Sequence, residues 1–347
     1  MEKRRLVIRA DAGDRLGTGH VMRCLALAQA WQDHARPAIF ATAAPTPALK
    51  IRLESEGTEV VKLAAAPGSA ADARETAQLA RQVGSPWVVV DGYHFGASYQ
   101  KLIKESGASL LFLDDVGHCD YYFADLVLNQ NLHASKSLYP RRAPYTRLLL
   151  GTRFVLLRRE YRQLRGWRRE IPGVARKVLV SLGGSDPLNQ TLKVIRALKQ
   201  VDLEGLKVTV VLGALNPHAQ VLQTVARTLS LPPRLVQNIQ DMPGLMAWAD
   251  LAVTSGGTTV WELAFTGLPS LGLALGEQEE ILLAAAANLG LMVNLGEAHT
   301  LEAPALATAI TDLAQNQEQR ASMSAKGHRQ VDGYGAERVI SMMKGGK

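Results

Sequence analysis

The sequence predicts an α/β protein built from two doubly wound, Rossmann-like domains. Short runs rich in β-branched and apolar residues alternate with helical patterns from one end of the 347-residue chain to the other. The runs are continuously apolar, which is typical of parallel strands covered by helices on both faces. A basic stretch containing proline and glycine interrupts this alternation in mid-chain, and the strand pattern restarts after it. We therefore expect two parallel sheets and an inter-domain cleft.

The apolar runs divide into two series. The strands expected in the first domain are RLVIRAD, AIFAT, EVVKL, WVVVD and SLLFLDD. The strands expected in the second, which begins at Arg176, are KVLVSLGG, KVTVVLG, RLVQNI, LAVTSGG, PSLGLAL and MVNLG. We expect a first domain at 1–155, a basic inter-domain connection at 156–175 and a second domain at 176–347, whose last helix can pack back on the first.

Charge and cysteine content exclude several classes of protein. The net charge is +7, and residues 136–177 alone carry 13 Lys or Arg against two acids. Without a nucleic-acid-binding signature, this fits an inter-domain connection or an anionic-ligand cleft better than a duplex-binding face, and a solvated basic surface is the alternative. Cys24 and Cys119 form no CxxC or ligand cluster, so neither disulfides nor a zinc site is expected.

The apolar segments and the first residues bear on localisation. No apolar run approaches about 18 residues, and the N-terminal stretch lacks the cleavage site of a signal peptide. We therefore expect a cytoplasmic protein with no nucleic-acid partner and no stable membrane association.

The stretch RADAGDRLGTGHVMRC places a histidine directly after a glycine-rich turn. Met22 stands where GxGxxG needs a third glycine, and the GK[ST] of a P-loop is absent. A helix beginning near Gly19 puts His20 in its first turn, where unpaired N–H groups and the helix dipole favour a neutral imidazole. In a ligand cleft such an imidazole can act as a general base; the alternative is that His20 only packs or caps a helix.

Two glycine turns follow strands of the second domain. Backbone N–H groups approach a phosphate closely where no Cβ intervenes, and a carboxylate about one turn into the following helix can accept hydrogen bonds from ribose hydroxyls. The alternatives are tight βα turns and an acid that complements the helix dipole. The residues concerned are Gly183, Gly184 and Ser185 in one turn, Ser255, Gly256, Gly257 and Thr258 in the other, and Glu262. Together they match a nucleotide diphosphate.

Acidic residues end two strands of the first domain. Asp91, with Tyr93 after it, can hydrogen-bond a sugar or serve a structural role. Asp114 and Asp115 lack a third metal ligand at a recognisable spacing, so we expect one of them to act as an N-cap and expect no metal site.

Many of these segments closely resemble the PseG-type UDP-sugar hydrolases of pseudaminic acid biosynthesis. The matching stretches are RADAGDRLGTGHVMRCLALA, VVVDGYHFG, LFLDD, LVLNQN, LVSLGGSDPLN, TSGGTTVWELAFTGLPSL, NLGLMVNLG and VDGYGAERV. The second domain also resembles the nucleotide-binding half of the MurG-type N-acetylglucosaminyltransferases. The resemblance implies a GT-B fold and hydrolysis of UDP-2,4-diacetamido-2,4,6-trideoxy-β-L-altropyranose at the anomeric carbon, with inversion, without a metal or other cofactor.

The resemblance also implies the roles of individual residues. His20 is the implied base. The implied sugar side is formed by Asp11, Gly17, Thr18, Gly19, Asp91 and Tyr93. The implied UDP site consists of Gly183, Gly184, Ser185, Asn238, Ile239, Ser255, Gly256, Gly257, Thr258, Glu262 and Gln278. The substrate is the expected partner, and a monomer is expected.

Two stretches depart from the family pattern, and two other functions stay open. GEQEE places Glu277 before Gln278 where an Asn-Gln pair is expected, and DGYH carries Gly92 and His94. One alternative is a GT-B glycosyltransferase, in which an acceptor hydroxyl replaces water. The other is a sugar-nucleotide-binding module without catalysis. UDP release in the absence of an acceptor distinguishes all three.

Overall fold

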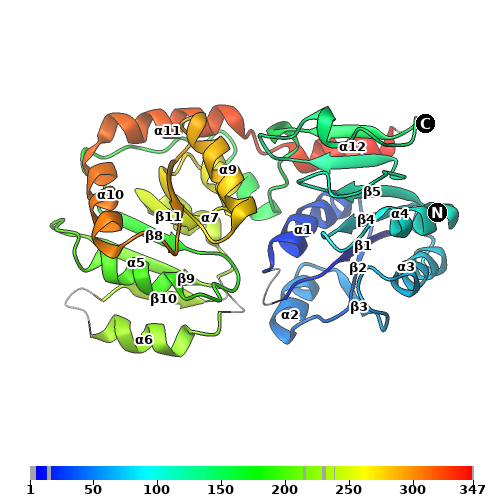
Figure 1. The fold of residues 1–347 in the computed structure, drawn as a ribbon, viewed down its shortest axis with the longest axis horizontal. Helices are drawn as coiled ribbons and strands as arrows, with labels where there is room; N and C mark the ends of the chain where they lie inside the picture. Colours follow the sequence, from blue (N-terminus) through cyan, green and yellow to red (C-terminus); the bar gives the residue numbers. More distant parts are fainter. Residues whose placement is uncertain (1–4, 14–16, 214–215, 229–231, 238, 346–347) are drawn as a thin grey trace. The chain divides into compact units, whose positions relative to one another are not determined.

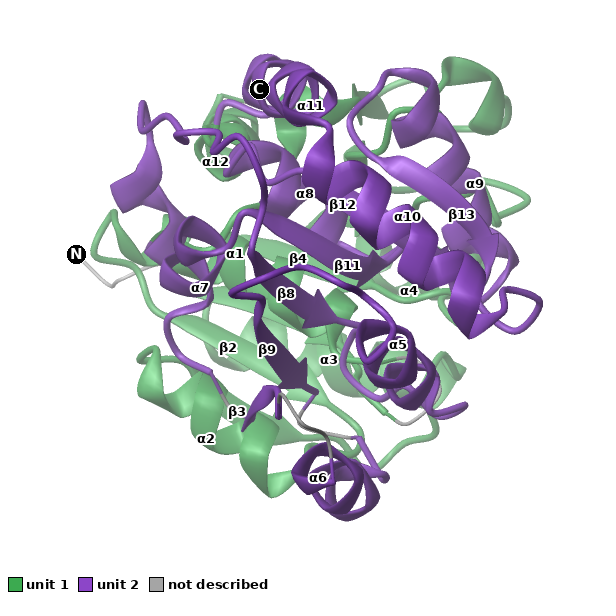
Figure 2. Ribbon diagram, turned by 90° about the vertical axis from the view of Figure 1, so that its left-hand side faces the viewer, with its two compact units in different colours: residues 1–159, 333–347 green, residues 160–332 purple. Residues whose placement is uncertain are grey.

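The chain forms two compact units (Figure 2). The computed structural model describes residues 5–13, 17–213, 216–228, 232–237 and 239–345. Unit 1 consists of Met1–Arg159 and Gly333–Lys347, and unit 2 of Glu160–Asp332. Unit 1 therefore extends a few residues beyond its expected end at 155 and includes the C-terminal segment. Most of the expected basic connection belongs to unit 2.

Unit 1 contains a seven-stranded parallel sheet in the order β3-β2-β1-β4-β5-β6-β7 (Figure 1). Its strands are β1 (Leu6–Ala10), β2 (Ala38–Thr42), β3 (Glu59–Lys62), β4 (Trp87–Asp91), β5 (Ser109–Leu113), β6 (Leu126–Asn129) and β7 (Arg147–Leu150). The first five strands confirm the prediction. The last two are missing from the expected set; β7 lies at the sheet edge inside the basic segment.

Helices cover both faces of this sheet. They are α1 (Gly19–Gln32), α2 (Pro47–Ser55), α3 (Ala70–Gln82), α4 (Ala97–Glu105) and α12 (Gly335–Lys344), with short 3₁₀ turns at Lys136–Leu138, Thr152–Phe154 and Arg159–Leu164. Alternate residues of β1 enter different cores, as the strand period requires. Leu6 and Ile8 pack with α1, α2 and α12, whereas Val7 packs with α3 and α4. Local caps start two helices: Thr46 accepts the N–H of Leu49, and Ser69 caps α3.

Unit 2 contains a six-stranded parallel sheet in the order β10-β9-β8-β11-β12-β13. Its strands are β8 (Lys177–Ser181), β9 (Lys207–Leu212), β10 (Arg234–Gln237), β11 (Leu251–Ser255), β12 (Ser270–Ala274) and β13 (Val293–Glu297). Its helices are α5 (Gln190–Leu198), α6 (Ala219–Arg227), α7 (Met242–Trp248), α8 (Thr259–Phe265), α9 (Glu277–Asn288), α10 (Ala303–Gln315) and α11 (Gln317–Gln330). These six strands correspond to the second series of apolar runs, so the doubly wound prediction is confirmed for both units.

Part of the basic segment has a structural role inside unit 2. The guanidinium of Arg169 donates to the carbonyl oxygens of Met246, Ala249 and Thr266, at or just beyond the ends of α7 and α8. Cations at helix C-termini satisfy carbonyl groups that have no partner within the helix. The side chain of Arg320 likewise donates to the carbonyls of Pro172 and Gly173 at 2.8 and 2.9 Å. The charges of Arg169 and Arg320 therefore stabilise the fold and are not part of a solvated surface.

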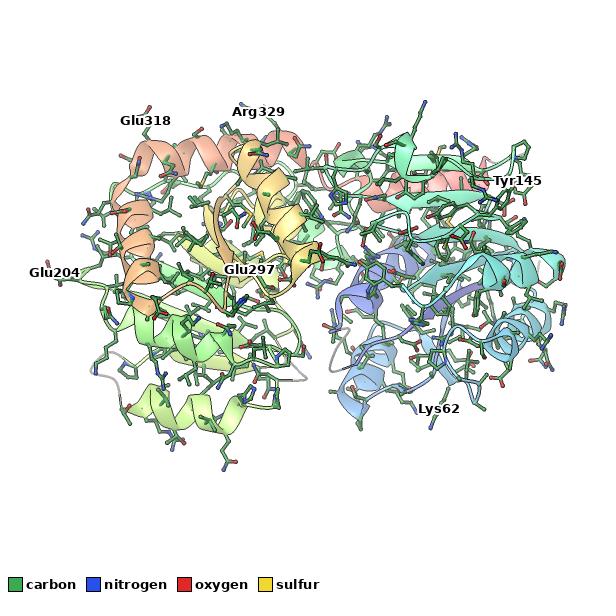
Figure 3. The ribbon with its side chains drawn as sticks, in the orientation of Figure 1. Lys62, Tyr145, Glu204, Glu297, Glu318 and Arg329 are labelled. Atoms are coloured by element: carbon green, nitrogen blue, oxygen red, sulfur yellow. The ribbon has the colours of Figure 1, made fainter. Side chains whose placement is uncertain are left out.

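Other charged side chains extend outward. Figure 3 shows Glu318 and Arg329 of α11 pointing away from the ribbon of unit 2. No helix in the described part of the chain is long and apolar enough to cross a membrane.

Candidate functional site

Both sheets have a topological switch point, where the strand order reverses direction. It lies between β1 and β4 in unit 1 and between β8 and β11 in unit 2 (Figure 1). Open parallel sheets bind ligands beyond the carboxyl ends of their strands at such points. Most of the predicted site residues follow these four strands. In unit 1, Asp91 ends β4 in register with Ala10 of β1, and His20 follows β1.

His20 and Asp91 form a hydrogen-bonded pair at this end of the sheet. Nδ1 of His20, in the first turn of α1, is 2.7 Å from Oδ1 of Asp91. Burial alone would raise the pKa of the Asp91 carboxyl, but the charges of Arg23 and His20 outweigh it and hold that pKa below its usual range. An ionised carboxylate only accepts hydrogen bonds, so Nδ1 carries the hydrogen. In the neutral imidazole, Nε2 then offers a lone pair.

Arg23 holds Asp91 from one turn further along α1. Its Nε and Nη2 donate to the two oxygens of Asp91, each at 2.6 Å, and its Nη1 donates to Asp115 at 2.6 Å. Burial alone would lower the pKa of the Arg23 guanidinium, but the charges of Asp115 and Asp91 raise it well above its usual value. The His20 ring therefore lies next to the permanent positive charge of Arg23. The same guanidinium holds both carboxylates, Asp91 and Asp115, in place.

Tyr93 packs edge-on against His20, with ring centroids 5.2 Å apart. Its hydroxyl lies 3.5 Å from Oδ2 of Asp115, and Asn131 donates to the other oxygen of Asp115 at 2.7 Å. Burial raises the pKa of the Tyr93 phenol, and the charge of Asp115 adds to this. The hydroxyl therefore stays protonated and can donate a hydrogen bond. Among the predicted sugar-side residues, the structure brings Asp91 and Tyr93 together with His20.

The glycine turn before His20 is closed by its own backbone. Gly13 and Gly17 exchange two N–H···O bonds of 3.2 and 2.7 Å. Gly17 has φ 66°, in the region that favours glycine. Thr18 precedes α1 and Gly19 begins it, so the predicted start of the helix is confirmed.

Asp11 lies at the same end of the sheet but belongs to another network. Its Oδ1 is 2.7 Å from Nη1 of Arg9, and its Oδ2 is 3.2 Å from Nε2 of His94. Arg9 is itself paired with Asp72 on α3 at 2.9 Å. The structure thus separates Asp11 from the group around His20.

The two predicted phosphate turns of unit 2 are adjacent. Gly183 has φ 81°, and a Cβ added to it would lie 3.5 Å from Oγ of Ser255. A Cβ on Gly213, just after β9, would lie 2.1 Å from the carbonyl oxygen of Gly184, so a third strand end packs against the first turn. Ser185 is buried at its end. Glycine is therefore required at 213 by close packing and at 183 by the positive φ.

The remaining predicted UDP residues are more dispersed. Glu262 lies in the first turn of α8, directly after the Ser255–Thr258 turn, and is half-buried. Ile239 follows the edge strand β10, two strands away from β8. Gln278 is exposed in the first turn of α9. Asn238 lies outside the described residues.

Glu279, one position after the predicted Gln278, contacts the second glycine turn. Its Oε2 accepts the N–H groups of Gly256 at 3.1 Å and of Leu275 at 2.9 Å. Burial raises the pKa of the Glu279 carboxyl, and these two hydrogen bonds oppose the shift. A Cβ on Gly256 would lie 2.5 Å from Cβ of Glu279, which explains the glycine.

One group of side chains in the described part of unit 1 has the composition of a metal site: Asp114, His118 and Cys119. The expectation that Cys119 joins no ligand cluster is therefore wrong in geometric terms. However, Asp114 already accepts three backbone N–H groups of the turn 116–118 and the hydroxyl of Tyr122. A carboxylate oxygen has few lone pairs to spare after these bonds. The expectation that one of the two acids is a helix N-cap is wrong, because no helix begins after them. Asp114 instead caps the turn 116–118.

Sequence reasoning gave no role to Arg23, Asp115, His94 or Glu279. For Arg23 a signal was available, because residues three apart on a helix share a face and the GHVMR spacing puts it beside His20. The partners of Asp115 and His94 depend on which strands are neighbours, which the sequence does not state.

Comparison with known proteins connects the chain with enzymes that act on UDP-sugars. Residues 178–334 match the glycosyltransferase family 28 C-terminal domain. The chain is 24% identical over 263 residues to the UDP-2,4-diacetamido-2,4,6-trideoxy-beta-L-altropyranose hydrolase of Campylobacter jejuni, covering 74% of this chain and 87% of that protein. It is 26% identical over 272 residues to a protein of Methanocaldococcus jannaschii, covering 76% of this chain and only 54% of that relative.

Similarity to solved structures shows the fold. MurG of Acinetobacter baumannii superimposes with a TM-score of 0.65 at 16% identity, over 98% of this chain and 99% of that chain. Together with the two doubly wound parallel sheets, this shows that the chain has the GT-B fold, as predicted.

Proposed function

We propose that the protein hydrolyses a UDP-linked 2,4-diacetamido-2,4,6-trideoxy sugar of altro configuration at the anomeric carbon, with inversion, and releases UDP and the free sugar. Unit 2 holds the nucleotide through the Gly183–Ser185 and Ser255–Thr258 turns, and Glu262 accepts hydrogen bonds from the ribose. Unit 1 supplies the base, His20, and the contacts to the sugar. The similarity to the Campylobacter hydrolase supports this substrate class.

The pairing of His20 with Asp91 and Arg23 carries the proposal. A general base needs a free lone pair and a fixed orientation. Asp91 fixes the tautomer of His20 through Nδ1, and Arg23 fixes Asp91 through both of its oxygens. The arrangement leaves Nε2 to receive a proton, and it lies at the switch point where ligands of such sheets bind.

The reaction needs one proton transfer to the protein. A water molecule against Nε2 of His20 gives up a proton to that nitrogen while its oxygen forms a bond to the anomeric carbon. The bond from this carbon to the diphosphate oxygen breaks, and its electron pair leaves with UDP. Attack opposite the leaving group inverts the centre, as in single-displacement glycosidases. Asp91 stabilises the imidazolium, and the backbone N–H groups of the glycine turns stabilise the departing diphosphate.

The test is UDP release from a panel of UDP-sugars with no acceptor present. We expect turnover of the UDP-2,4-diacetamido sugar of altro configuration, slower turnover of the gluco isomer, and an inverted anomer as the first product seen by NMR. If the protein binds UDP by calorimetry but releases none from any sugar of the panel, hydrolysis is excluded as its activity.

A glycosyltransferase is the second candidate, because the match of residues 178–334 is to a domain of a glycosyltransferase family. In that reaction His20 takes the proton of an acceptor hydroxyl, and water is excluded. UDP release would then be negligible alone and rise when acceptor sugars are added. The same panel, repeated with and without acceptors, therefore separates the two reactions.

A further inference from the structure

Unit 1 contains a second His–Asp pair at the same switch point. Nε2 of His94 lies 3.2 Å from Oδ2 of Asp11. The two pairs are crossed between the strands: Asp11 follows β1 and His94 follows β4, whereas His20 follows β1 and Asp91 ends β4. Because side chains alternate along a strand, the pairs lie on opposite faces of the sheet, Asp91 towards α1 and Asp11 towards α3.

The carboxylate of Asp11 is positioned by groups other than His94. Its Oδ1 receives Nη1 of Arg9 at 2.7 Å, the hydroxyl of Thr42 at 3.0 Å and the N–H of Ala43 at 2.9 Å. Burial alone would raise the pKa of the Asp11 carboxyl, but hydrogen bonds from His94 and Arg9 hold it below the usual range. Since the ionised carboxylate only accepts, Nε2 of His94 carries the hydrogen, and Nδ1 of the neutral ring is an acceptor.

Glycines provide the room for this imidazole. Gly92 has φ 150°, and a Cβ there would lie 2.9 Å from Cε1 and 3.3 Å from Nδ1 of His94. Gly68, with φ 76°, lies so close that a Cβ would be 2.2 Å from the His94 carbonyl oxygen. The ring rests on Phe95, at 4.0 Å between centroids. Gly92 thus leaves room for the ring, Gly68 leaves room for the backbone of His94, and Phe95 contacts the ring.

One edge of the His94 ring remains available. Its side chain is 26% exposed, although Asp11 is only 8% exposed. Among the described residues, Nδ1 of His94 has no hydrogen-bond partner. Its neighbour in sequence, Tyr93, packs on His20. Tyr93 therefore lies next to both histidines, to His94 along the chain and to His20 by contact.

Local charge selects the ligand group that this acceptor can bind. Arg9 carries one positive charge, and Asp72 and Asp11 carry two negative charges between them, so the buried set is net negative. In this net negative environment, binding of a negatively charged diphosphate at Nδ1 of His94 is disfavoured. A neutral hydrogen-bond donor is not repelled and is favoured as the partner of the Nδ1 lone pair. A sugar offers such donors as ring hydroxyls and acetamido N–H groups.

We propose that His94 is a sugar-recognition residue, whose Nδ1 accepts a hydrogen bond from a neutral O–H or N–H donor on the sugar of the nucleotide-sugar substrate. Asp11 and Arg9 are positioning residues that fix its tautomer. This inference rests on the proposed function for the identity of the ligand, but it requires binding only and no turnover.

Three substitutions at position 94 test the roles of Nδ1 and Nε2 separately. His94→Gln keeps an amide that reaches Asp11 and removes the acceptor at the Nδ1 position. His94→Asn places an amide oxygen near the Nδ1 position and gives up the contact with Asp11. His94→Phe removes both polar atoms and keeps the ring on Phe95. Thermal unfolding of each variant verifies that it folds, and His299→Gln, an exposed histidine of unit 2, is the matched control.

Binding is measured by calorimetry in the His20→Asn background, with UDP and with UDP-2,4-diacetamido-2,4,6-trideoxy-β-L-altropyranose as the probes. We expect His94→Gln and His94→Phe to weaken the UDP-sugar about threefold to tenfold, as for loss of one neutral hydrogen bond, and to leave UDP unchanged. His94→Asn should lose less. Equal weakening of UDP, or unchanged affinity for the UDP-sugar in all three variants, would overturn the proposal.

Analogues identify the donor. If it is an acetamido N–H, N-methylation of that group weakens binding to the parent protein and causes no further loss in His94→Gln. If it is a hydroxyl, the deoxy analogue behaves in this way. If each modified sugar loses the same affinity in the parent protein and in His94→Gln, the proposal is wrong. Absence of UDP release by the wild-type protein would remove the hydrolase assignment alone, since these binding measurements need no turnover.

Discussion

The two units share one winding pattern and use different chemistry at the equivalent place. The order β2-β1-β4-β5 of unit 1 corresponds to β9-β8-β11-β12 of unit 2, with the switch point at the centre of each. At β1/β4 the structure places His20 beside Arg23 and Asp91, both of which are buried ions. At β8/β11 it places glycines and hydroxyl groups, and close packing leaves no room for a Cβ at Gly213 and Gly256.

In our proposal, this difference lets one topology serve two tasks. A buried ion pair is costly to break, about 3–5 kcal/mol when one partner is removed, so it holds an imidazole in one orientation. Glycine turns present backbone N–H groups that carry no net charge and suit an anion that must also be released. In our proposal, proton transfer belongs to unit 1 and anion binding to unit 2, and each prediction below tests that division.

The largest effect is expected from His20→Asn. Loss of a positioned base lowers kcat about 10²- to 10⁴-fold. UDP affinity measured by calorimetry should stay unchanged, because we propose that the nucleotide contacts lie in unit 2. His34→Asn, at an exposed position just after α1, is the control. If His20→Asn weakened UDP as much as it slowed turnover, the division between the units would fail.

Glu262→Ala makes the converse change in unit 2. Hydrogen bonds to a charged acceptor contribute about 1.5–3 kcal/mol, so UDP and UDP-sugar affinities should fall together by about tenfold to hundredfold. Glu262→Gln should lose less, since its amide oxygen still accepts. Glu318→Ala, at an exposed position on α11 (Figure 3), should bind UDP normally. Unchanged UDP binding in folded Glu262→Ala would leave this residue only a helix-dipole role.

Neighbouring glycines of unit 2 separate packing from binding. A Cβ at Gly256 meets Glu279, whereas a Cβ at Gly257 meets nothing within 4 Å. Gly256→Ala should lower the free energy of unfolding by about 1–3 kcal/mol, as overpacking does. Gly257→Ala should leave it nearly unchanged and weaken UDP binding alone. Urea denaturation and calorimetry on both variants test this, and equal stability of the two would contradict the close contact with Glu279.

His118 is a partly buried histidine of unit 1 that we place outside the reaction. Burial alone would lower the pKa of its imidazole, but the Asp114 carboxylate, whose Oδ1 lies 3.0 Å from Nδ1, raises it to about 10. Because the folded value lies above the unfolded value of about 6.5, the charged pair stabilises fully below that pH and its contribution disappears as pH rises through the folded value. His118→Gln should therefore cost about 1–2 kcal/mol near pH 6 and almost nothing at pH 10, in urea titrations across this range. A cost independent of pH would show that packing, not charge, matters here.

The smallest effect is expected from chelation. Since the oxygens of Asp114 are occupied by hydrogen bonds within the turn, EDTA should leave both UDP release and thermal unfolding unchanged. Inhibition by EDTA that a divalent ion reverses would show that a metal acts in one of the two units.

The strands were predicted from continuous apolar runs, and most strands of this fold contain such a run. Strands buried on both faces read as continuous apolar runs, and eleven such runs all form strands in the structure. Strand β7 was missed although the edge strands β3 and β10, of the same length, were predicted. RLLL has no β-branched residue, whereas EVVK and RLVQ each contain valine, so its sequence favours a strand less.

The sequence did not predict those contacts of the site whose two residues lie far apart in the chain. His20 was identified because its turn and helix are local, but Asp91 is 71 residues away and Asp115 is 92 residues from Arg23. Their pairing depends on strand neighbours. In α9, Gln278 and Glu279 differ by one position, which turns a side chain by about 100° on a helix. Motif reading located that helix start but not the face that meets Gly256.

The return of the chain to unit 1 sets the order in which the protein can mature on the ribosome. Helix α12 supplies Val339, Ile340 and Met343 to the core around α1, and the indole of Trp87 donates to the carbonyl of Met343 at 3.0 Å. Unit 2 is contiguous in sequence, whereas unit 1 must wait for residues 160–332 to be synthesised before this core closes. Domains tend to fold as they emerge. The nascent unit 1 therefore keeps this apolar surface open until translation has passed Met343.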